Sequence, residues 1–441
     1  MSTVQCRDGQ NIAQGAIPEQ IQKGMGVNMA KVAVLGHGVV GSGVVEVMEK
    51  NKAVIEKKAG QSMEVKRILD LREFPGLPYS DKFTKDFQDI LNDEEISVVA
   101  EVMGGTHPAF EFVTACLEKG KSVVTSNKEL VAAKGAQLLA TAKAHNVNFF
   151  FEASVGGGIP IIRPLHHCLA ANEIDEVAGI LNGTTNFILT KMIREQMPFD
   201  EALALAQKLG YAEKDPTADI EGHDACRNIC ILASLCYGKH VYPETVHTEG
   251  ITKITLEDVA YAEDWGGVIK LIGRAKKLDN GMLVAMVSPA FIPHDSQLAS
   301  IDDVFNGILV RGNATGDVVF YGKGAGKLPT ASAVVADIIA AAKSTHTSNS
   351  LTWVDSHESY VLDHTQTDIA FYLRFVSNDP NAKTNVAAKL GNVRFLSRAN
   401  QPVNEFAVVT EVMNEGKLEK ALEDLKAEGI DLLGKIRVLD Y

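Results

Sequence analysis

Short apolar runs alternate with stretches of helical periodicity over the first third of the chain. Buried strands are predicted at residues 31–35, 64–70, 96–103, 122–125 and 148–152. Helices are predicted between them, at residues 44–58, 86–92, 108–119 and 129–145. Strands that alternate with helices in this way are typical of βαβ units. The sequence therefore predicts an α/β domain with a parallel sheet over residues 29–158.

The hydrophobic pattern changes after residue 158. Strands are predicted at residues 174–181, 282–290, 307–311 and 317–321, and helices at 184–195, 199–210, 224–237 and 265–277. This mixture predicts an α+β domain over residues 159–321. An Ala- and Val-rich helix is predicted at 330–343, and we expect residues 322–343 to pack back on the first domain and complete it.

The last part of the chain has a pattern of its own. Residues 344–357 are rich in Ser, Thr, His and Asn, which predicts a linker. Beyond it, strands are expected at 369–376, 406–412 and 433–439 and helices at 382–390 and 417–428. This order predicts a compact βαββαβ-like module over residues 358–441. Residues 1–28 show no period and no signal-peptide pattern, so we expect a loose tail.

Composition narrows the class of protein. The 441 residues include 43 Lys and Arg against 56 Asp and Glu, a net charge of −13, with 46% hydrophobic residues. An acidic chain without a dense run of basic residues is expected to bind nucleic acid poorly. No apolar run reaches the roughly 18 residues needed to span a bilayer. The six cysteines form no CxxC pair, which favours reduced thiols in the cytoplasm. These features argue against a nucleic-acid-binding or membrane-spanning protein and favour a cytosolic enzyme.

A glycine motif lies directly after the first predicted strand. Gly36-x-Gly38-x-x-Gly41 follows the strand and opens a helix, which is the context of a dinucleotide-binding loop rather than of an ordinary tight turn. Its helix N-terminus would bind the pyrophosphate, so we predict a Rossmann-type domain. Asp70 ends the second strand, where a carboxylate binds the ribose diol of NAD. Arg72 would instead bind the 2′-phosphate of NADP, and a surface charge pair remains a third interpretation.

Further polar residues follow the later strands. Lys128 lies just beyond the fourth strand, at the edge of the sheet where open α/β domains bind ligands, although a solvated lysine would look the same in sequence. A glycine run follows the fifth strand within residues 152–160, and residues 182–186 form a polar turn before a helix. The densest cluster of ionisable residues spans 210–224. Helix capping explains only one or two of its acids, so we predict a cationic ligand there.

Taken together, these motifs resemble the homoserine dehydrogenase family, in its long bacterial form with a C-terminal ACT domain. The resemblance covers residues 29–441 and depends most on residues 210–224, together with the glycine pair at 104–105. It implies the NAD- or NADP-dependent interconversion of homoserine and aspartate semialdehyde. It also implies a homodimer built through the middle domain, a bound Na⁺ or K⁺ ion, and threonine as a feedback effector.

The resemblance also implies roles for individual residues. The cofactor would be bound by Gly36, Gly38, Val39, Val40, Gly41, Asp70, Arg72, Gly105, Thr106, Lys128 and Gly326. The substrate would be bound by Gly183, Thr184, Glu213, Asp219 and Asp224, with Glu213 on the ammonium group. The monovalent cation would lie at Glu152, Val155, Gly157 and Ile159, mostly on backbone oxygens. Catalysis would involve Lys128, Asp219, Asp224 and the residue at position 228.

One departure from the family pattern falls at this last position. The family has a lysine four residues after the final aspartate, as the proton donor and acceptor, whereas this chain has Asn228. An amide forms hydrogen bonds but does not titrate near neutral pH. Arg227 is adjacent but points about 100° away around the helix. Three interpretations remain open: a variant with reduced activity, an enzyme that relies on Lys128, or a silent homologue that binds nucleotide and amino acid as a sensor.

The C-terminal module departs from its family as well. ACT domains typically carry Asp-x-Pro-Gly after the first strand, and this chain has residues 378–381 in the order Asn-Asp-Pro-Asn. The final glycine of that turn is therefore absent here.

Overall fold

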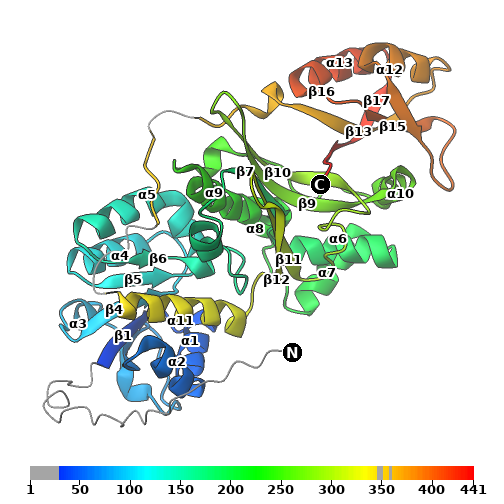
Figure 1. Cartoon of the computed structure of the whole chain (residues 1–441). Coiled ribbons are helices and arrows are strands. Elements are labelled where there is room, and N and C mark those ends of the chain that lie inside the picture. Colours follow the sequence, from blue (N-terminus) through cyan, green and yellow to red (C-terminus); the bar gives the residue numbers. More distant parts are fainter. Residues whose placement is uncertain (1–28, 345–350, 357–359) are drawn as a thin grey trace, which may run out of the picture.

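The computed structural model describes residues 29–344, 351–356 and 360–441. The predicted tail at 1–28 and part of the predicted linker lie outside these residues. Three parts of the chain follow one another in space, coloured blue to cyan, green, and orange to red in Figure 1. The described residues form two large β-sheets, one in the N-terminal part and one shared by the other two parts.

The first sheet has six parallel strands in the order β3-β2-β1-β4-β5-β6. Its strands are β1 (Met29–Leu35), β2 (Ser62–Leu69), β3 (Phe83–Thr84), β4 (Ile96–Glu101), β5 (Ser122–Thr125) and β6 (Phe149–Phe150). Its helices are α1 (Val39–Lys50), α2 (Lys52–Ala59), α3 (Gln88–Leu91), α4 (Ala109–Glu118), α5 (Lys128–Ala144) and α11 (Lys327–Lys343).

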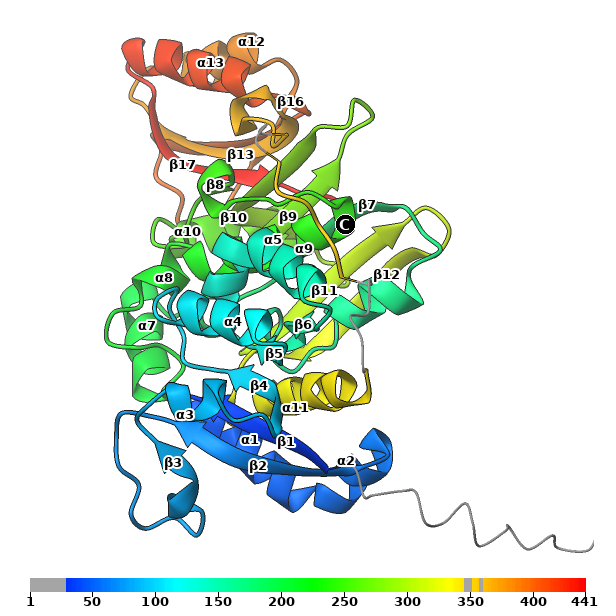
Figure 2. The ribbon, with the colours of Figure 1, turned by 90° about the vertical axis from the view of Figure 1, so that its left-hand side faces the viewer.

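Helices cover both faces of this sheet. In β1, Val32 and Val34 pack on the side of α1, α2 and α11, while Ala33 and Leu35 pack on the side of α4 and α5. Strands covered on both faces lack polar alternation, which is why they are visible in the sequence as continuous apolar runs. The helix α11, yellow in Figures 1 and 2, lies among the N-terminal elements although it follows the middle part in sequence.

The second sheet begins in the middle part of the chain. Its strands there are β7 (Ile174–Ile180), β8 (His247–Thr248), β9 (Gly267–Lys277), β10 (Leu283–Pro293), β11 (Phe305–Gly312) and β12 (Gly316–Lys323). The helices are α6 (Gly183–Glu195), α7 (Phe199–Lys208), α8 (Thr217–Ile220), α9 (His223–Tyr237) and α10 (Leu256–Trp265). Together with the parallel first sheet, this mixed sheet confirms the predicted fold class.

The prediction of a helix at 265–277 was wrong, because Gly267–Lys277 form the strand β9. Helix α10 ends at Trp265, and Gly266 has a φ of +104°, which ends the helix. The residues that follow form an interior strand between β7 and β10 and are buried on both faces over most of its length. A buried strand without alternation cannot be distinguished from a buried helix by periodicity, so the pattern was ambiguous.

The C-terminal part continues the second sheet. It contains β13 (Asp368–Val376), α12 (Ala382–Leu390), β14 (Val393–Leu396), β15 (Glu405–Thr410), β16 (Met413–Asn414), α13 (Glu415–Ala427) and β17 (Asp431–Val438). This order agrees with the predicted βαββαβ module, with the additional short strand β16. Strand β17 pairs in parallel with β10, through Ala290 with Arg437 and Phe291 with Val438. An eleven-stranded sheet therefore runs through both parts within the described residues.

The segment between α11 and the C-terminal module is partly described. Its residues 351–356 lie against α5, and Trp353 is buried there. A Cβ at Gly135 of α5 would lie 2.5 Å from the Trp353 ring, so the glycine makes room for the indole. Over the parts of the chain that the structure describes, no helix combines the length and apolar character needed to cross a membrane.

Candidate active site

The predicted nucleotide loop lies between β1 and α1. Gly36 has a φ of +95°, and its N–H donates to the last carbonyl of β2 at 2.8 Å. A Cβ at Gly41 would lie 1.9 Å from the Gly36 carbonyl oxygen, so only glycine lets α1 pass this close to the loop. Gly38 is the N-cap of α1, and Val39 and Val40 are its first residues. The first N–H groups of α1 therefore face this loop, as in sites that bind pyrophosphate.

Asp70 and Arg72 form an ion pair directly after β2. Asp70 Oδ1 accepts from Arg72 N at 2.9 Å and Nε at 3.0 Å, and Oδ2 accepts from Arg72 Nη2 at 2.9 Å and His37 N at 2.8 Å. The hydrogen bonds from Arg72 hold the pKa of Asp70 well below its ordinary range. The Arg72 side chain is 63% exposed, and a cavity of about 270 Å³ opens beside the pair. A ribose diol would therefore compete with Arg72 for the carboxylate, whereas a 2′-phosphate would find an exposed guanidinium.

The loops after β4 and β5 are tied to each other. Asn127 caps α5 with its side-chain oxygen and donates Nδ2 to the Gly105 carbonyl at 2.6 Å. Thr106 Oγ1 lies 3.5 Å from Glu129 Oε1. Gly326, with a φ of +129°, is the N-cap of α11, which packs against α1. The predicted cofactor residues of these loops thus lie at the same edge of the parallel sheet.

A buried carboxylate at this edge was missed in the sequence. Glu101 ends β4 and is fully buried. Its carboxylate accepts from Thr125 Oγ1 at 2.7 Å and from Met103 N at 2.8 Å, and burial raises its pKa. It therefore joins the ends of β4 and β5. An acid inside an otherwise apolar strand was the signal in the sequence.

Three predicted catalytic residues meet between the two domains. Lys128, the first residue of α5, donates Nζ to Asp224 Oδ1 at 2.8 Å. Asn182, at the end of β7, donates Nδ2 to Asp224 Oδ2 at 3.0 Å and to Asp219 Oδ1 at 2.7 Å. Its side-chain oxygen accepts from Thr185 N at 2.9 Å and so caps α6. One amide therefore holds both carboxylates beside the lysine, whereas the sequence pattern marked Asn182 only as part of a polar turn.

The two carboxylates differ in their tendency to ionise. Burial opposes ionisation of Asp224, but Lys128 and the hydrogen bonds from Lys128 and Asn182 hold its pKa below the ordinary value. Burial raises the pKa of Asp219, and the charge of Asp224 adds to this rise. Environments that separate the pKa values of neighbouring acids are typical of acid–base sites. Asp224 is thus the ionised partner of Lys128, and Asp219 takes up a proton more readily.

Asn228 lies one helical turn after Asp224 and is only 1% exposed. Its Nδ2 donates to the Leu181 carbonyl and to the Asp224 carbonyl, both at 3.1 Å. Its Oδ1 is buried and has no hydrogen-bond partner among the described residues. The amide therefore fastens α9 to the end of β7. Arg227 pairs with Glu129 of α5 at 3.7 Å.

Glu213 does not join this cluster. It lies exposed in the loop between α7 and α8, and its carboxylate has no hydrogen bond or ion pair with another described residue. Thr184 connects this loop to the site, since its Oγ1 donates to the Tyr211 carbonyl at 2.6 Å. Gly183, the first residue of α6, lies close to the main chain of Val304. The predicted substrate residues are therefore brought together in part.

The predicted cation loop follows β6. The Glu152 carboxylate is buried, and it accepts three backbone N–H groups at 2.6–2.9 Å, from Ile161, Ile162 and Arg163. Gly157 has a φ of +53°, and a Cβ there would lie 2.3 Å from the Gly324 carbonyl oxygen. Because the Glu152 carboxylate is occupied, the oxygens left for a cation are main-chain carbonyls, including those of Val155 and Ile159. Such hard oxygen donors fit Na⁺ or K⁺.

A parallel sheet with an anion-binding glycine loop, and a lysine–carboxylate cluster at its carboxyl edge, define a nicotinamide-dependent oxidoreductase. Family models agree: residues 36–152 match the model "Homoserine dehydrogenase, NAD binding domain", and residues 160–339 match "Homoserine dehydrogenase". The chain belongs to the homoserine dehydrogenase family.

Individual relatives support this assignment. The chain is 39% identical over 417 residues to homoserine dehydrogenase of Synechocystis sp., covering 90% of this chain and 95% of that protein. The crystal structure of a homoserine dehydrogenase from Thiobacillus denitrificans superposes with a TM-score of 0.86 at 36% identity, over 94% of this chain and 99% of that one. A hyperthermophilic archaeal homoserine dehydrogenase mutant in complex with NADPH has a TM-score of 0.61 at 27% identity, over 71% of this chain and 98% of that one.

Proposed function

We propose that this enzyme interconverts homoserine and aspartate 4-semialdehyde with NADP or NAD, and that Lys128 transfers the proton at the substrate oxygen. The observation that carries this is the contact of Lys128 Nζ with Asp224 Oδ1 at 2.8 Å. It places an amine at the carboxyl edge of the nucleotide-binding sheet, beside two partly buried acids. The family match favours this enzyme over a silent sensor.

The bound nicotinamide supplies the hydride acceptor in oxidation and the hydride donor in reduction. In oxidation, Lys128 first releases its own proton, and its amine then takes the proton of the substrate hydroxyl. In reduction, its ammonium form returns a proton to the forming alkoxide. Asp224 orients the lysine, and Asp219 and Glu213 attract the substrate ammonium group. Asn182 keeps the two aspartates in place through its shared Nδ2.

The hydrogen bonds of the Asn228 side chain support the assignment of proton transfer to Lys128. Both of its hydrogen bonds as donor go to main-chain carbonyls. An amide has no proton to exchange near neutral pH. Asn228 therefore contributes to the packing of α9. In our proposal, Lys128 transfers the proton instead.

The test is to measure kcat for homoserine oxidation in the wild type and in Lys128→Met. General acid–base catalysis contributes about 10²–10⁴-fold, so we expect a loss in that range. Binding of NADPH, followed by its fluorescence, should weaken by less than about tenfold, because Lys128 is only one of the proposed cofactor contacts and the nucleotide loop is unchanged. A Lys128→Met enzyme with wild-type kcat would remove Lys128 from the reaction. The Lys134→Met variant, on the same helix, is the matched control.

The cofactor is proposed to be NADP or NAD without strong preference. The archaeal relative bound to NADPH supports NADP, and the exposed Arg72 beside the cavity suits a 2′-phosphate. Asp70 supports NAD, since a carboxylate at this place binds a free ribose diol.

A monovalent cation is proposed at the loop of residues 155–159. The main-chain oxygens of Val155, Gly157 and Ile159 would hold it, beside Glu152. A ligand that binds only the folded state raises its stability. We therefore expect a higher melting temperature in KCl or NaCl than in choline chloride at equal ionic strength. Equal melting temperatures in the three salts would contradict the site.

A homodimer, an amino-acid effector and a cytoplasmic location complete the proposal. The edge strand β12 is largely exposed, with Tyr321 58% exposed, which suits a contact through the middle domain. The C-terminal βαββαβ module suits an effector such as threonine. Light scattering of the purified enzyme tests the dimer, and threonine titration of its activity tests the effector.

A further inference from the structure

We call residues 247–251 the β8 segment and residues 219–224, which carry the catalytic acids, the catalytic turn. The β8 segment lies directly against the catalytic turn. Ile251 N–H donates to the Ile220 carbonyl at 2.8 Å. A Cβ at Gly250 would lie 2.1 Å from the same carbonyl oxygen, so the two main chains are in close contact. A Cβ at Gly222 would likewise lie 3.3 Å from the Glu249 carbonyl oxygen. Movement of the β8 segment therefore moves the catalytic turn.

The other side of the β8 segment is held by the C-terminal module. Glu249 Oε1 accepts from Arg437 Nη1 at 2.8 Å and lies 2.6 Å from His247 Nε2. Arg437, on β17, is only 1% exposed, and it also donates Nε to Glu415 Oε2 at 3.2 Å. Burial opposes ionisation of Glu249, but His247 and Arg437 hold its pKa at about 2. The contact is therefore a charged, hydrogen-bonded link between the module and the catalytic domain.

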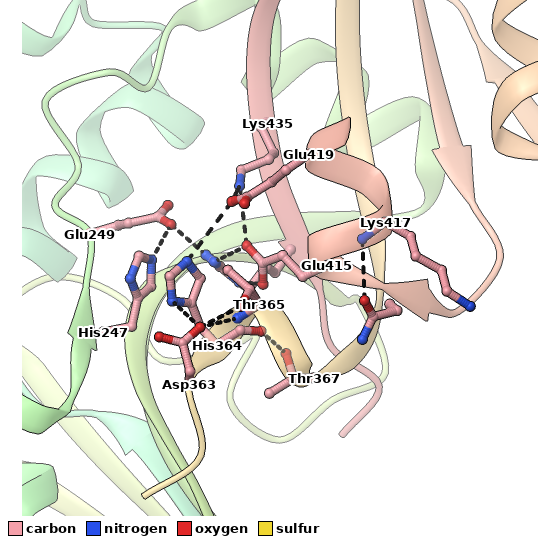
Figure 3. A network of polar contacts seen from close by, with 12 residues as sticks. His247, Glu249, Asp363, His364, Thr365, Thr367, Glu415, Lys417, Glu419 and Lys435 are labelled. Atoms are coloured by element: carbon pink, nitrogen blue, oxygen red, sulfur yellow. Dashed lines mark hydrogen bonds and ion pairs between the residues drawn. The ribbon is translucent and has the colours of Figure 1, made fainter. Parts of the chain in front are cut away.

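Figure 3 shows this network at close range. The His247 and His364 rings stack with their centroids 3.6 Å apart and an interplanar angle of 16°. His364, Glu415 and Glu419 place their ligand atoms within 4.8 Å of one another, as a metal site would. Glu415, however, accepts from Arg437 and from Lys435. A divalent cation would have to displace these cations, so the cluster is an ion-paired network within the C-terminal module.

A second polar contact holds the module to α10. Tyr372 Oη donates to Asp258 Oδ1 at 2.9 Å, and Arg374 Nε lies 3.1 Å from the same carboxylate oxygen. This contact is more deeply buried than the first one, and Asp258 makes no hydrogen bond with the catalytic turn. The chain thus provides one module contact that reaches the turn and one that does not.

We propose that Glu249 is a positioning residue for the catalytic turn, and that Arg437 of the C-terminal module holds it in its working place. The inference depends on the proposed function only for the identity of the reaction. Docking of the module then sets the geometry of Asp219 and Asp224. The proposed chain of contacts runs from Arg437 to the Glu249 carboxylate, then along the main chain of the β8 segment to Ile220.

The variants Glu249→Gln and Arg437→Met test this path with limited damage. After either change, the remaining charged groups keep a partner, because Arg437 retains Glu415 and Glu249 retains His247. Displacement of a catalytic group by about 1 Å costs up to about 10²-fold in rate. We expect kcat to fall about tenfold in both variants, with the NADPH dissociation constant unchanged.

Arg437→Lys keeps the charge and should recover most of the rate. Tyr372→Phe, which weakens the contact with α10, is the matched control and should keep wild-type kcat. If Tyr372→Phe loses as much rate as Glu249→Gln, loose docking of the module in general is responsible, and the role of Glu249 is rejected.

Hydrogen–deuterium exchange gives a readout that is independent of the reaction. Peptides covering the catalytic turn should exchange faster in Glu249→Gln and Arg437→Met than in the wild type or Tyr372→Phe. Unchanged exchange in the turn would overturn the proposal even if the substrate were another compound. A wild type that does not oxidise homoserine but shows faster exchange in the variants would instead contradict only the proposed function. If one variant fails to fold by circular dichroism, the other and Arg437→Lys decide the outcome.

Discussion

Asn228 illustrates how a single side chain changes the assignment of a catalytic group. At this position the family pattern leads one to expect an amine, and the amide found here is engaged by two main-chain carbonyls. The amine of Lys128 lies instead against Asp224. Chemistry that the family pattern places on α9 is thus available on α5, from the other domain.

We expect Asn228→Lys to change kcat by less than about tenfold, since we propose that Lys128 transfers the proton. The melting temperature should fall, because the substitution breaks two buried hydrogen bonds, each worth about 1 kcal/mol, and buries an amine. Steady-state kinetics and differential scanning fluorimetry measure both effects. A gain in kcat of about 10²-fold or more would show that α9 carries the proton-transfer position after all.

Arg72→Ala should weaken NADP about tenfold or more, which corresponds to ~1.4 kcal/mol. NAD should bind equally well or more tightly, because the substitution frees the Asp70 oxygens that Arg72 now occupies. Fluorescence titration with NADPH and NADH separates these outcomes. Equal weakening of both cofactors would mean that Arg72 supports the loop rather than the phosphate. The wild type should bind both cofactors within about tenfold of each other.

At the scale of the elements, strands covered by helices and helices with clear caps could be predicted from the sequence. Elements whose conformation depends on contacts with distant parts of the chain could not. The strands of the parallel sheet were visible because both of their faces are apolar. Strand β9 was mistaken for a helix for the same reason, since burial on both faces removes the alternation that identifies a strand. The candidate residues were found where a motif marks them. Glu101 was marked only by its place inside an apolar strand, and the partners of Glu101 and Asn182 come from distant segments that no local pattern reveals.

Helix α5 is also held by a histidine outside the catalytic cluster. His240 donates Nε2 to the Ala132 carbonyl at 2.7 Å, and its Nδ1 accepts from Trp353 Nε1 at 3.0 Å. Burial lowers the pKa of His240. Protonation would place a proton on the nitrogen that accepts from the indole. Folding therefore requires the neutral ring in this place.

The stability of the enzyme should consequently fall with acid. The unfolded chain takes up a proton at His240 as pH falls below the ordinary histidine pKa of about 6.5, and the folded chain takes it up only at lower pH. Stability from this group is complete above that pH and is lost between it and the lowered pKa of the folded state. The melting temperature should drop between pH 7.5 and 5.5, and less so in His240→Asn than in the control His145→Asn. Parallel pH profiles for the two variants would contradict this assignment.

In the whole molecule, the second sheet unites two parts of the chain that the sequence suggested as separate modules. Strand β17 lies between β10 of the middle part and β13 of the C-terminal part. Phe291 of β10 stacks on Tyr372 of β13, with ring centroids 4.5 Å apart. Strand order at such a junction is set by long-range pairing, so the sequence pattern does not predict it.

Removal of residues 358–441 should therefore damage more than regulation. The truncated chain would expose the edge of β10 and the buried face around Phe291, and exposed edges of this kind promote aggregation. We expect the truncated protein to elute as aggregate in size-exclusion chromatography, while the full chain elutes as a dimer. A soluble truncated dimer with wild-type melting temperature would show that the middle part is complete on its own.

The β10–β17 pairing also governs the order of events during synthesis. Strand β17 leaves the ribosome well after β10, because the two strands lie far apart in the sequence. At roughly 5–20 residues per second, the part of β10 that pairs with β17, at Ala290 and Phe291, stays unpaired on the order of ten seconds. Folding of the N-terminal domain is delayed as well, because α11, which packs in that domain, follows the middle part in sequence. We therefore expect the nascent chain to be a client for chaperones until β17 has been translated.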